Sequence, residues 1–202
     1  MLDAKLRPLI DPPLARLAKL FVSAGISANA VTWVGFGIGM VSVPLLTLHH
    51  YEWALGCIVL NRLADGLDGA IARHNGVSDY GGYLDIALDF IFYAGVVLGM
   101  SLSRPDEAIY GAFLLWTFMG TASTFLAYAI LAAKHDVTTE IRGPKTIYYL
   151  GGLAEGTETF LVLGLFCLMP QWFAPICIIF GVMCMITAAT RIYAARDRFG
   201  GS

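Results

Sequence analysis

The sequence predicts an all-α membrane protein: a six-transmembrane-helix bundle with an N-terminal interfacial amphipathic helix. Three observations lead to this fold class. The 202-residue chain is 57% hydrophobic and only 14% charged. Its mean hydropathy is +0.69, which is too apolar for a soluble domain of this size. Six apolar stretches recur along it, each near the roughly 20 residues that a helix needs to cross a hydrocarbon core of about 30 Å.

The first segment, residues 1–28, is predicted to lie along the cytoplasmic surface of the membrane. Its apolar side chains recur at helical spacing, and its cations Arg16 and Lys19 fall on other faces of the same helix. The apolar side chains are Leu14, Leu17, Leu20 and Phe21. A helix of this kind is typical of segments that lie in the membrane interface.

The six spans make up one predicted domain, residues 29–196, followed by a short tail at residues 197–202. The spans cover residues 30–48, 52–72, 82–102, 108–133, 145–169 and 172–194. The connections between them are short, which favours antiparallel neighbours in one compact bundle. In the first span, Gly35 and Gly39 form a small-residue face that allows close helix packing.

The cations are unevenly distributed over the two sides of the membrane. With six spans, both termini share one side with the connections near residues 74–81 and 134–144, and eleven of the thirteen Lys and Arg residues lie on that side. The positive-inside rule therefore predicts that the termini are cytoplasmic. We expect the inner membrane of a bacterium. The formal net charge of −2 does not indicate a nucleic-acid partner.

The second and third spans carry acidic side chains at membrane depth. Asp65 and Asp68 share one face of the second span, and Asp85 and Asp89 share one face of the third, because residues three and four apart are neighbours on a helix. The two spans are antiparallel, so the four carboxylates can converge. A lipid-facing Asp at the membrane centre costs about 2.5 to 3.5 kcal/mol. We therefore expect these side chains to face a water-filled cavity that opens to the cytoplasm.

Converging carboxylates need counter-charge, and oxygen-rich clusters suit hard divalent cations such as Mg²⁺, Mn²⁺ or Ca²⁺. Gly69 and Ala72 leave room beside the cluster, and Arg73 supplies a planar fork that fits phosphate. Metal and arginine together indicate a phosphate-containing ligand. Two alternatives remain open: structural pairing of the aspartates with Arg62 and Arg73, and a divalent-cation transporter. Arg62, three residues before Asp65, is the expected partner of that aspartate.

These residues form a pattern that spans 25 positions: Asp65, Asp68, Gly69, Ala72, Arg73, Gly81, Asp85 and Asp89. The pattern resembles the signature of the CDP-alcohol phosphotransferases, membrane enzymes that make phospholipids from CDP-activated donors. That family has six transmembrane helices and an N-terminal interfacial helix. Its "P-N-x-x-T"-like segment before the first span appears here as "SANAVTW", with Ala28 in place of proline.

The resemblance implies an enzyme that transfers a phosphatidyl group from CDP-diacylglycerol to the hydroxyl of a small alcohol and releases CMP. The implied metal ligands for one or two Mg²⁺ or Mn²⁺ ions are Asp65, Asp68 and Asp85, with Asp89 as a further ligand. Asp89 is also the implied general base. The implied contacts of the CDP group are Asp65, Gly69, Ala72 and Arg73. The resemblance also implies a homodimer.

The alcohol acceptor is expected to bind near the fifth span. Arg142 and Lys145 lie at its cytoplasmic end and would bind a phosphorylated acceptor, or they are ordinary cytoplasmic cations. Glu155 and Glu158 lie deeper, where carboxylates are costly unless they face the bundle. These two side chains would bind hydroxyls or an amine of the acceptor, or pair with Arg62. The sequence leaves the identity of the alcohol open.

Overall fold

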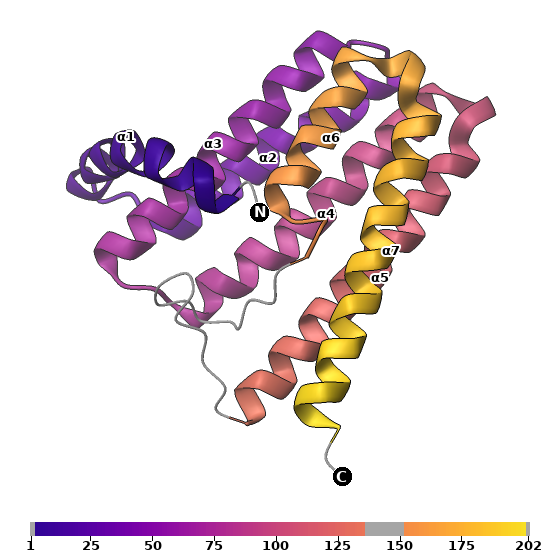
Figure 1. The fold of residues 1–202 in the computed structure, drawn as a ribbon. Helices are drawn as coiled ribbons and strands as arrows, with labels where there is room; N and C mark the ends of the chain where they lie inside the picture. Colours follow the sequence, from indigo (N-terminus) through magenta and orange to yellow (C-terminus); the bar gives the residue numbers. More distant parts are fainter. Residues whose placement is uncertain (1–2, 136–151, 201–202) are drawn as a thin grey trace.

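The structure is a computed structural model that describes residues 3–135 and 152–200 (Figure 1). Every regular element in these two ranges is a helix, which confirms the predicted all-α class. The helices are α1 (Asp3–Ser23), α2 (Ala28–Thr47), α3 (Tyr51–Asn75), α4 (Asp79–Ser103), η1 (Pro105–Glu107), α5 (Ala108–Lys134), α6 (Gly156–Leu168), η2 (Pro170–Trp172) and α7 (Phe173–Phe199).

Four helical segments of the described chain are long and apolar enough to cross a membrane. They are α2, α4, η1 with α5, and η2 with α7. Helix α3 is as long as α4, at 25 residues, but its second half carries the charged side chains between Arg62 and Arg73. Helix α6 is apolar but has only 13 residues. The membrane character predicted from composition is therefore confirmed, and α3 and α6 are the two predicted spans that differ from a simple apolar helix.

The prediction of one continuous helix over the fifth span, residues 145–169, was wrong. In the structure α6 starts at Gly156 and residues 152–155 are not helical, while residues 145–151 lie outside the described part of the chain. The apolar character of the sequence runs on across this point, so hydropathy alone did not mark the start of the helix.

A hydroxyl on α7 explains how the non-helical stretch is held. The backbone N–H groups of Leu153 and Ala154 both donate hydrogen bonds to the Oγ1 atom of Thr187, each at 3.0 Å. The Thr187 hydroxyl in turn donates to the carbonyl oxygen of Met183 at 2.9 Å. Backbone groups without a helical partner are tolerated in a membrane protein where the surrounding protein satisfies them.

Helices α2 and α3 are antiparallel and unusually close. A Cβ atom at Gly35 would lie 2.5 Å from the Cβ of Ala64, and one at Gly39 would lie 2.9 Å from the amide nitrogen of Asn61. That amide donates a hydrogen bond to the carbonyl oxygen of Gly35 at 3.1 Å. The predicted small-residue face is thus confirmed, and it brings the acidic part of α3 directly against α2.

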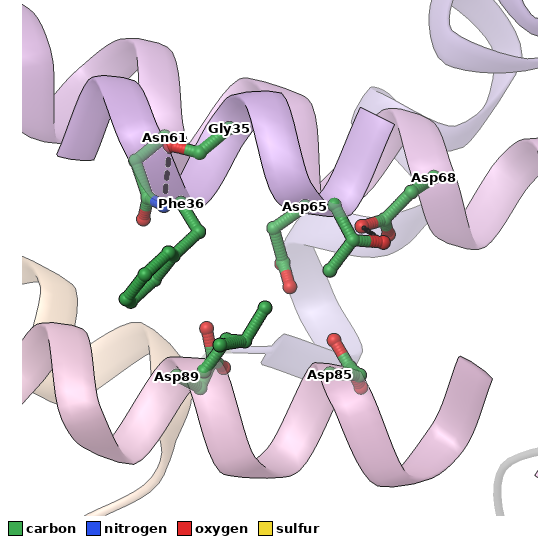
Figure 2. A pocket seen from close by; sticks show the side chains of 9 residues that line it. Gly35, Phe36, Asn61, Asp65, Asp68, Asp85 and Asp89 are labelled. Carbon is green, nitrogen blue, oxygen red and sulfur yellow. Dashed lines mark hydrogen bonds between the residues drawn. The ribbon is translucent and has the colours of Figure 1, made fainter. Parts of the chain in front are cut away.

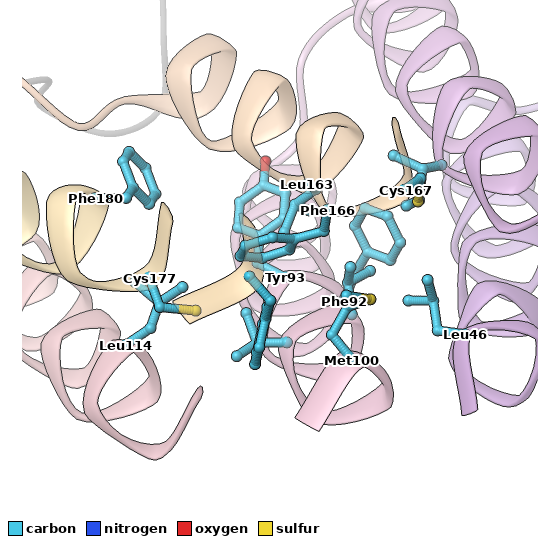
Figure 3. Packing of buried hydrophobic residues seen from close by; sticks show 14 of the residues in the cluster. Leu46, Phe92, Tyr93, Met100, Leu114, Leu163, Phe166, Cys167, Cys177 and Phe180 are labelled. Carbon is cyan, nitrogen blue, oxygen red and sulfur yellow. The ribbon is translucent and has the colours of Figure 1, made fainter. Parts of the chain in front are cut away.

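The main apolar core joins α4 to α6, with contributions from the other long helices (Figure 3). Phe92 of α4 and Phe166 of α6 are fully enclosed in it. Lipid is as apolar as these side chains, so the core is held by close van der Waals packing and not by exclusion of water. This packing fixes α6 against the acidic helix α4.

Helix α1 packs on α3 through one face. Ala18 is 1% exposed and lies in a small apolar cluster with side chains of α3, and a Cβ at Gly66 would lie 2.8 Å from the side chain of Leu14. Leu17 and Leu20 are instead 45% and 65% exposed. Helix α1 thus carries apolar side chains on both its packed and its exposed faces.

The connections between helices divide between the two ends of the bundle (Figure 1). The turn between α3 and α4 lies at the same end as the C-terminal end of α7, whereas the turns that leave α2, α4 and α6 lie at the opposite end. Antiparallel neighbours joined by short turns give this arrangement.

Candidate active site

Four aspartates of α3 and α4 line one pocket. Asp65 and Asp68 extend from α3 toward Asp85 and Asp89 on α4 (Figure 2). The other residues that line it come from α2, α3 and α4: Thr32, Gly35, Phe36, Asn61 and Leu88. The structure therefore brings together the four carboxylates in the way that their helical spacing predicts.

Three of these carboxylates are close enough to share a metal ion. One oxygen atom each of Asp65, Asp68 and Asp85 lies within 4.8 Å of the others. Oxygens on opposite sides of a Mg²⁺ ion are about 4.2 Å apart, because each Mg–O distance is about 2.1 Å. A small side-chain movement is therefore enough to reach coordination distance. The all-oxygen donor set fits a hard divalent cation better than zinc.

Asp68 is the most enclosed of the three carboxylates, with 6% of the residue exposed. Its Oδ2 atom accepts a hydrogen bond from the Thr32 hydroxyl at 2.6 Å. The sequence placed Thr32 in the "SANAVTW" segment but not beside Asp68, because the pairing depends on how α2 packs against α3. Helix α2 thus contributes a side chain that orients a carboxylate of α3.

Asp65 is held by a cation one turn earlier on the same helix. The guanidinium of Arg62 forms an ion pair with its carboxylate, as expected from the three-residue spacing. Asp65 still lines the pocket with its side chain.

Asp89 has a partner on its own helix that the sequence reasoning missed. The hydroxyl of Tyr93 donates a hydrogen bond to Oδ2 of Asp89 at 2.8 Å. The signal was present in the sequence, since the tyrosine follows the aspartate by four residues and so shares its helical face. Asp89 lines the pocket beside the other three aspartates but is not part of the group that lies within 4.8 Å.

The small residues and the arginine predicted to bind the donor occupy the last turns of α3. A Cβ atom at Gly69 would lie 3.5 Å from Nη1 of Arg73, so the guanidinium lies over the glycine, one turn away. Arg73 is exposed and Ala72 is partly buried. A planar cation and a position without a side chain are therefore adjacent, directly after Asp68.

Two of the four residues predicted for the acceptor lie in the described chain. Arg142 and Lys145 are outside the described residues. Glu155 is 6% exposed, and its carboxylate accepts a hydrogen bond from the backbone N–H of Gly152 at 2.9 Å. Glu158 is partly buried in the first turn of α6. Both glutamates thus lie at the start of α6.

The start of α6 adjoins the partners of the aspartates. A Cβ atom at Gly156 would lie 3.9 Å from Nη2 of Arg62 and 4.0 Å from the hydroxyl oxygen of Tyr93. Arg62 is the partner of Asp65 and Tyr93 is the partner of Asp89. The first turn of α6 therefore lies immediately behind the acidic pocket.

A carboxylate cluster beside an arginine, in a bundle of long apolar helices, fits a membrane protein that binds a divalent metal ion and a phosphate-containing ligand. Residues 25–193 match the family model described as CDP-alcohol phosphatidyltransferase, and the chain belongs to that family. It is therefore a CDP-alcohol phosphotransferase, and its cofactor is a divalent metal ion, which the aspartate group fits.

Similar proteins span nearly the whole chain. Inner membrane protein YnjF of Escherichia coli (strain K12) is 49% identical over 195 residues, which are 96% of this chain and 95% of that protein. Archaetidylinositol phosphate synthase of Pyrococcus horikoshii is 28% identical over 198 residues, 96% of this chain and 97% of that protein.

A solved protein shares the fold. Mycobacterium tuberculosis phosphatidylinositol phosphate synthase (PgsA1) with CDP-DAG bound matches with a TM-score of 0.74 at 18% identity, over 91% of this chain and 93% of that one. The same protein in complex with manganese and citrate matches with a TM-score of 0.69 at 19% identity, over 89% and 87%.

Proposed function

We propose that this enzyme transfers a phosphatidyl group from CDP-diacylglycerol to the hydroxyl of a small alcohol, with release of CMP. The observation that carries the proposal is the group of three aspartates beside Asp89 in one pocket between α3 and α4. Membership of the family supports a CDP-activated donor, and the M. tuberculosis protein that shares the fold has CDP-DAG bound. The alternative, a divalent-cation transporter, has no support from these similarities.

Asp89 is the general base of the proposed reaction. The acceptor oxygen forms a bond to the phosphorus that carries the diacylglycerol, and the proton of the acceptor hydroxyl passes to Asp89. The bond from that phosphorus to the bridging oxygen breaks, and CMP leaves with this oxygen. Asp65, Asp68 and Asp85, with Asp89 as a further ligand, would hold one or two Mg²⁺ or Mn²⁺ ions. A bound ion neutralises the diphosphate and stabilises the departing CMP.

The donor is proposed to bind along the last turns of α3. Gly69 and Ala72 leave room for the diphosphate, and the fork of Arg73 fits phosphate oxygens in a bidentate manner. Asp65 contacts the CDP group from the preceding turn. The acyl chains of the donor stay in the surrounding lipid, so the diphosphate approaches the pocket from the side.

The acceptor is proposed to bind at the start of α6, next to Asp89. Glu155 and Glu158 would contact its hydroxyl groups, and Arg142 and Lys145 would bind a phosphate if the acceptor carries one. Two relatives have names that include an inositol phosphate product, which makes phosphorylated polyols the first acceptors to test.

We also propose how the chain lies in the cell. Helices α2 to α7 cross a bacterial inner membrane as the catalytic domain, residues 29–196, and the tail at 197–202 and the active site face the cytoplasm. The E. coli relative is named an inner membrane protein. Residues 1–28 lie on the cytoplasmic leaflet, which accounts for the exposed Leu17 and Leu20 of α1. Two chains form a homodimer.

The test is CMP release by the purified protein. It is supplied with radiolabelled CDP-diacylglycerol, Mg²⁺ or Mn²⁺, and a panel of phosphorylated and unphosphorylated alcohols. We expect CMP with at least one acceptor, and CMP release slowed by about 100-fold or more in Asp89→Asn. Asp79→Asn is the matched control, because Asp79 is an exposed residue at the start of α4. Absence of CMP with every acceptor would refute the reaction, and full activity in Asp89→Asn would refute the assignment of the base.

Glu158→Gln tests the acceptor site in the same assay. A changed order of preference among the acceptors, with the KM for CDP-diacylglycerol unaltered, is the expected result. An unaltered order and an unaltered acceptor KM would assign Glu158 to the structure of α6 instead.

A further inference from the structure

We infer that Tyr93 is a positioning residue for Asp89. Its hydroxyl holds one oxygen of the carboxylate, so that the other oxygen stays directed at the acceptor hydroxyl. The inference rests on the proposed role of Asp89 as the general base, and it adds a residue that lies outside the aspartate pattern.

The contact between the two side chains is direct. The Tyr93 hydroxyl donates to Oδ2 of Asp89 at 2.8 Å, within one turn of α4. The terminal torsion of an aspartate is broad, with two roughly equivalent orientations. A hydrogen bond to one oxygen removes most of that freedom. Asp89 also lines the pocket, so the carboxylate is tied on one side and exposed to substrate on the other.

The donor is itself fixed in place. Tyr93 is 9% exposed, and its ring belongs to the main apolar core, with the ring centre of Phe92 at 5.8 Å. Figure 3 shows the ring within this core, which also includes Leu163 and Phe166 of α6. A large rigid ring in a close-packed core does not move without displacing its neighbours. The hydroxyl at its tip is therefore a stationary point from which to orient a carboxylate.

Helix α6 backs this arrangement from the far side. A Cβ atom at Gly156 would lie 4.0 Å from the Tyr93 hydroxyl oxygen and 3.9 Å from Nη2 of Arg62. The two partners that hold Asp89 and Asp65 thus both lie beside the first turn of α6.

The role of Tyr93 predicts a specific kinetic change. Tyr93→Phe removes one oxygen atom and keeps the ring in the core. We expect kcat to fall about 10- to 100-fold, because a small misplacement of a catalytic group has effects of this order. The KM for CDP-diacylglycerol should stay within about twofold, since the Tyr93 hydroxyl contacts Asp89 and not the end of α3, where the donor is proposed to bind. Tyr110→Phe is the matched control: it makes the same change in a partly buried tyrosine of α5 that packs on the same core.

A double variant separates positioning from packing. In the Asp89→Asn background, Tyr93→Phe should cause no additional loss of the residual activity, because no base remains to be positioned.

The inference is overturned if kcat is unchanged in Tyr93→Phe, or if the losses in the double variant multiply. These outcomes differ from a failure of the proposed function. That failure appears as full activity in Asp89→Asn or as no CMP from the unaltered enzyme.

Discussion

Thr32 places one hydroxyl hydrogen between two acceptors. Its oxygen lies 2.6 Å from Oδ2 of Asp68 and 3.0 Å from the carbonyl oxygen of Ala28. A threonine has a single hydroxyl hydrogen to donate, and bonds to a charged acceptor are shorter and stronger than neutral ones. The bond to Asp68 is therefore the stronger of the two. It gives an enclosed carboxylate of the proposed metal site a fixed orientation.

Removal of this hydroxyl should weaken metal use. We expect Thr32→Val to raise the Mn²⁺ concentration for half-maximal CMP release, or to lower activity, by about 10-fold, which is typical when the partner of a metal ligand is lost. Thr47→Val is the control, because Thr47 makes the same bond to a backbone carbonyl four residues earlier, that of Val43 at 3.0 Å, at the other end of α2. Equal losses in the two variants would show that the bond to Asp68 is unimportant.

Loss of a ligand should have a larger effect than loss of its partner. Asp68→Asn should abolish measurable CMP release and Mn²⁺ binding, since the amide supplies neither charge nor two equivalent oxygens. Chelation of the metal should have the same effect on the unaltered enzyme, with recovery on addition of Mg²⁺ or Mn²⁺. Mn²⁺ binding can be followed by electron paramagnetic resonance. Mn²⁺ affinity retained in Asp68→Asn would remove this residue from the metal site.

The spacing of residues along single helices was the part of the site that the sequence predicted well. Asp65 with Asp68, and Asp85 with Asp89, share faces by helical geometry alone, and the antiparallel order of the spans brings the two pairs together. Thr32 could not be paired with Asp68 in the same way, because 36 residues separate them and the contact depends on the register of α2 against α3. The same four-residue spacing that pairs Asp85 with Asp89 also places Tyr93 beside Asp89. The sequence prediction missed this contact.

Among the helices, the close contact between α2 and α3 brings the Asp68 carboxylate against Thr32. A Cβ at Gly35 would lie 2.5 Å from the Cβ of Ala64, so Gly35→Ala must push the two helices apart. We expect a loss of stability of about 1 to 3 kcal/mol, as for other overpacked sites. Gly37→Ala is the control, since a Cβ at Gly37 meets nothing within 4 Å. Thermal unfolding in detergent measures both, and equal midpoints would contradict the close contact.

The start of α6 is a helix boundary that hydropathy does not reveal. Residues 152–155 were expected to be helical because the apolar pattern continues through them. The hydroxyl of Thr187, more than thirty residues later, accepts the bonds of Leu153 and Ala154 that a helix would otherwise satisfy. A backbone conformation that is stabilised by a distant side chain leaves no local signal in the sequence.

For the molecule as a whole, the proposed orientation follows from the distribution of cations and from the two ends of the bundle in Figure 1. A green fluorescent protein fused after the C-terminus should fluoresce in cells, because the proposed topology places the C-terminus in the cytoplasm. Alkaline phosphatase, which is active only outside the cytoplasm, should be inactive at that position and active when fused after Arg104, between α4 and η1. The reverse pattern would invert the proposed topology.

The short length of α6 has a consequence for the biogenesis of the enzyme. Its 13 residues make about 20 Å of helix at 1.5 Å per residue, less than the hydrocarbon core of about 30 Å. We expect the nascent α6 to be unable to settle in the bilayer by itself and to enter as a hairpin with α7, to which η2 joins it. The Thr187 hydroxyl that holds Leu153 and Ala154, the residues just before α6, is then in place only after α7 has left the ribosome. A chain that stops before α7 would carry all four aspartates without this support, and we expect it to be inactive.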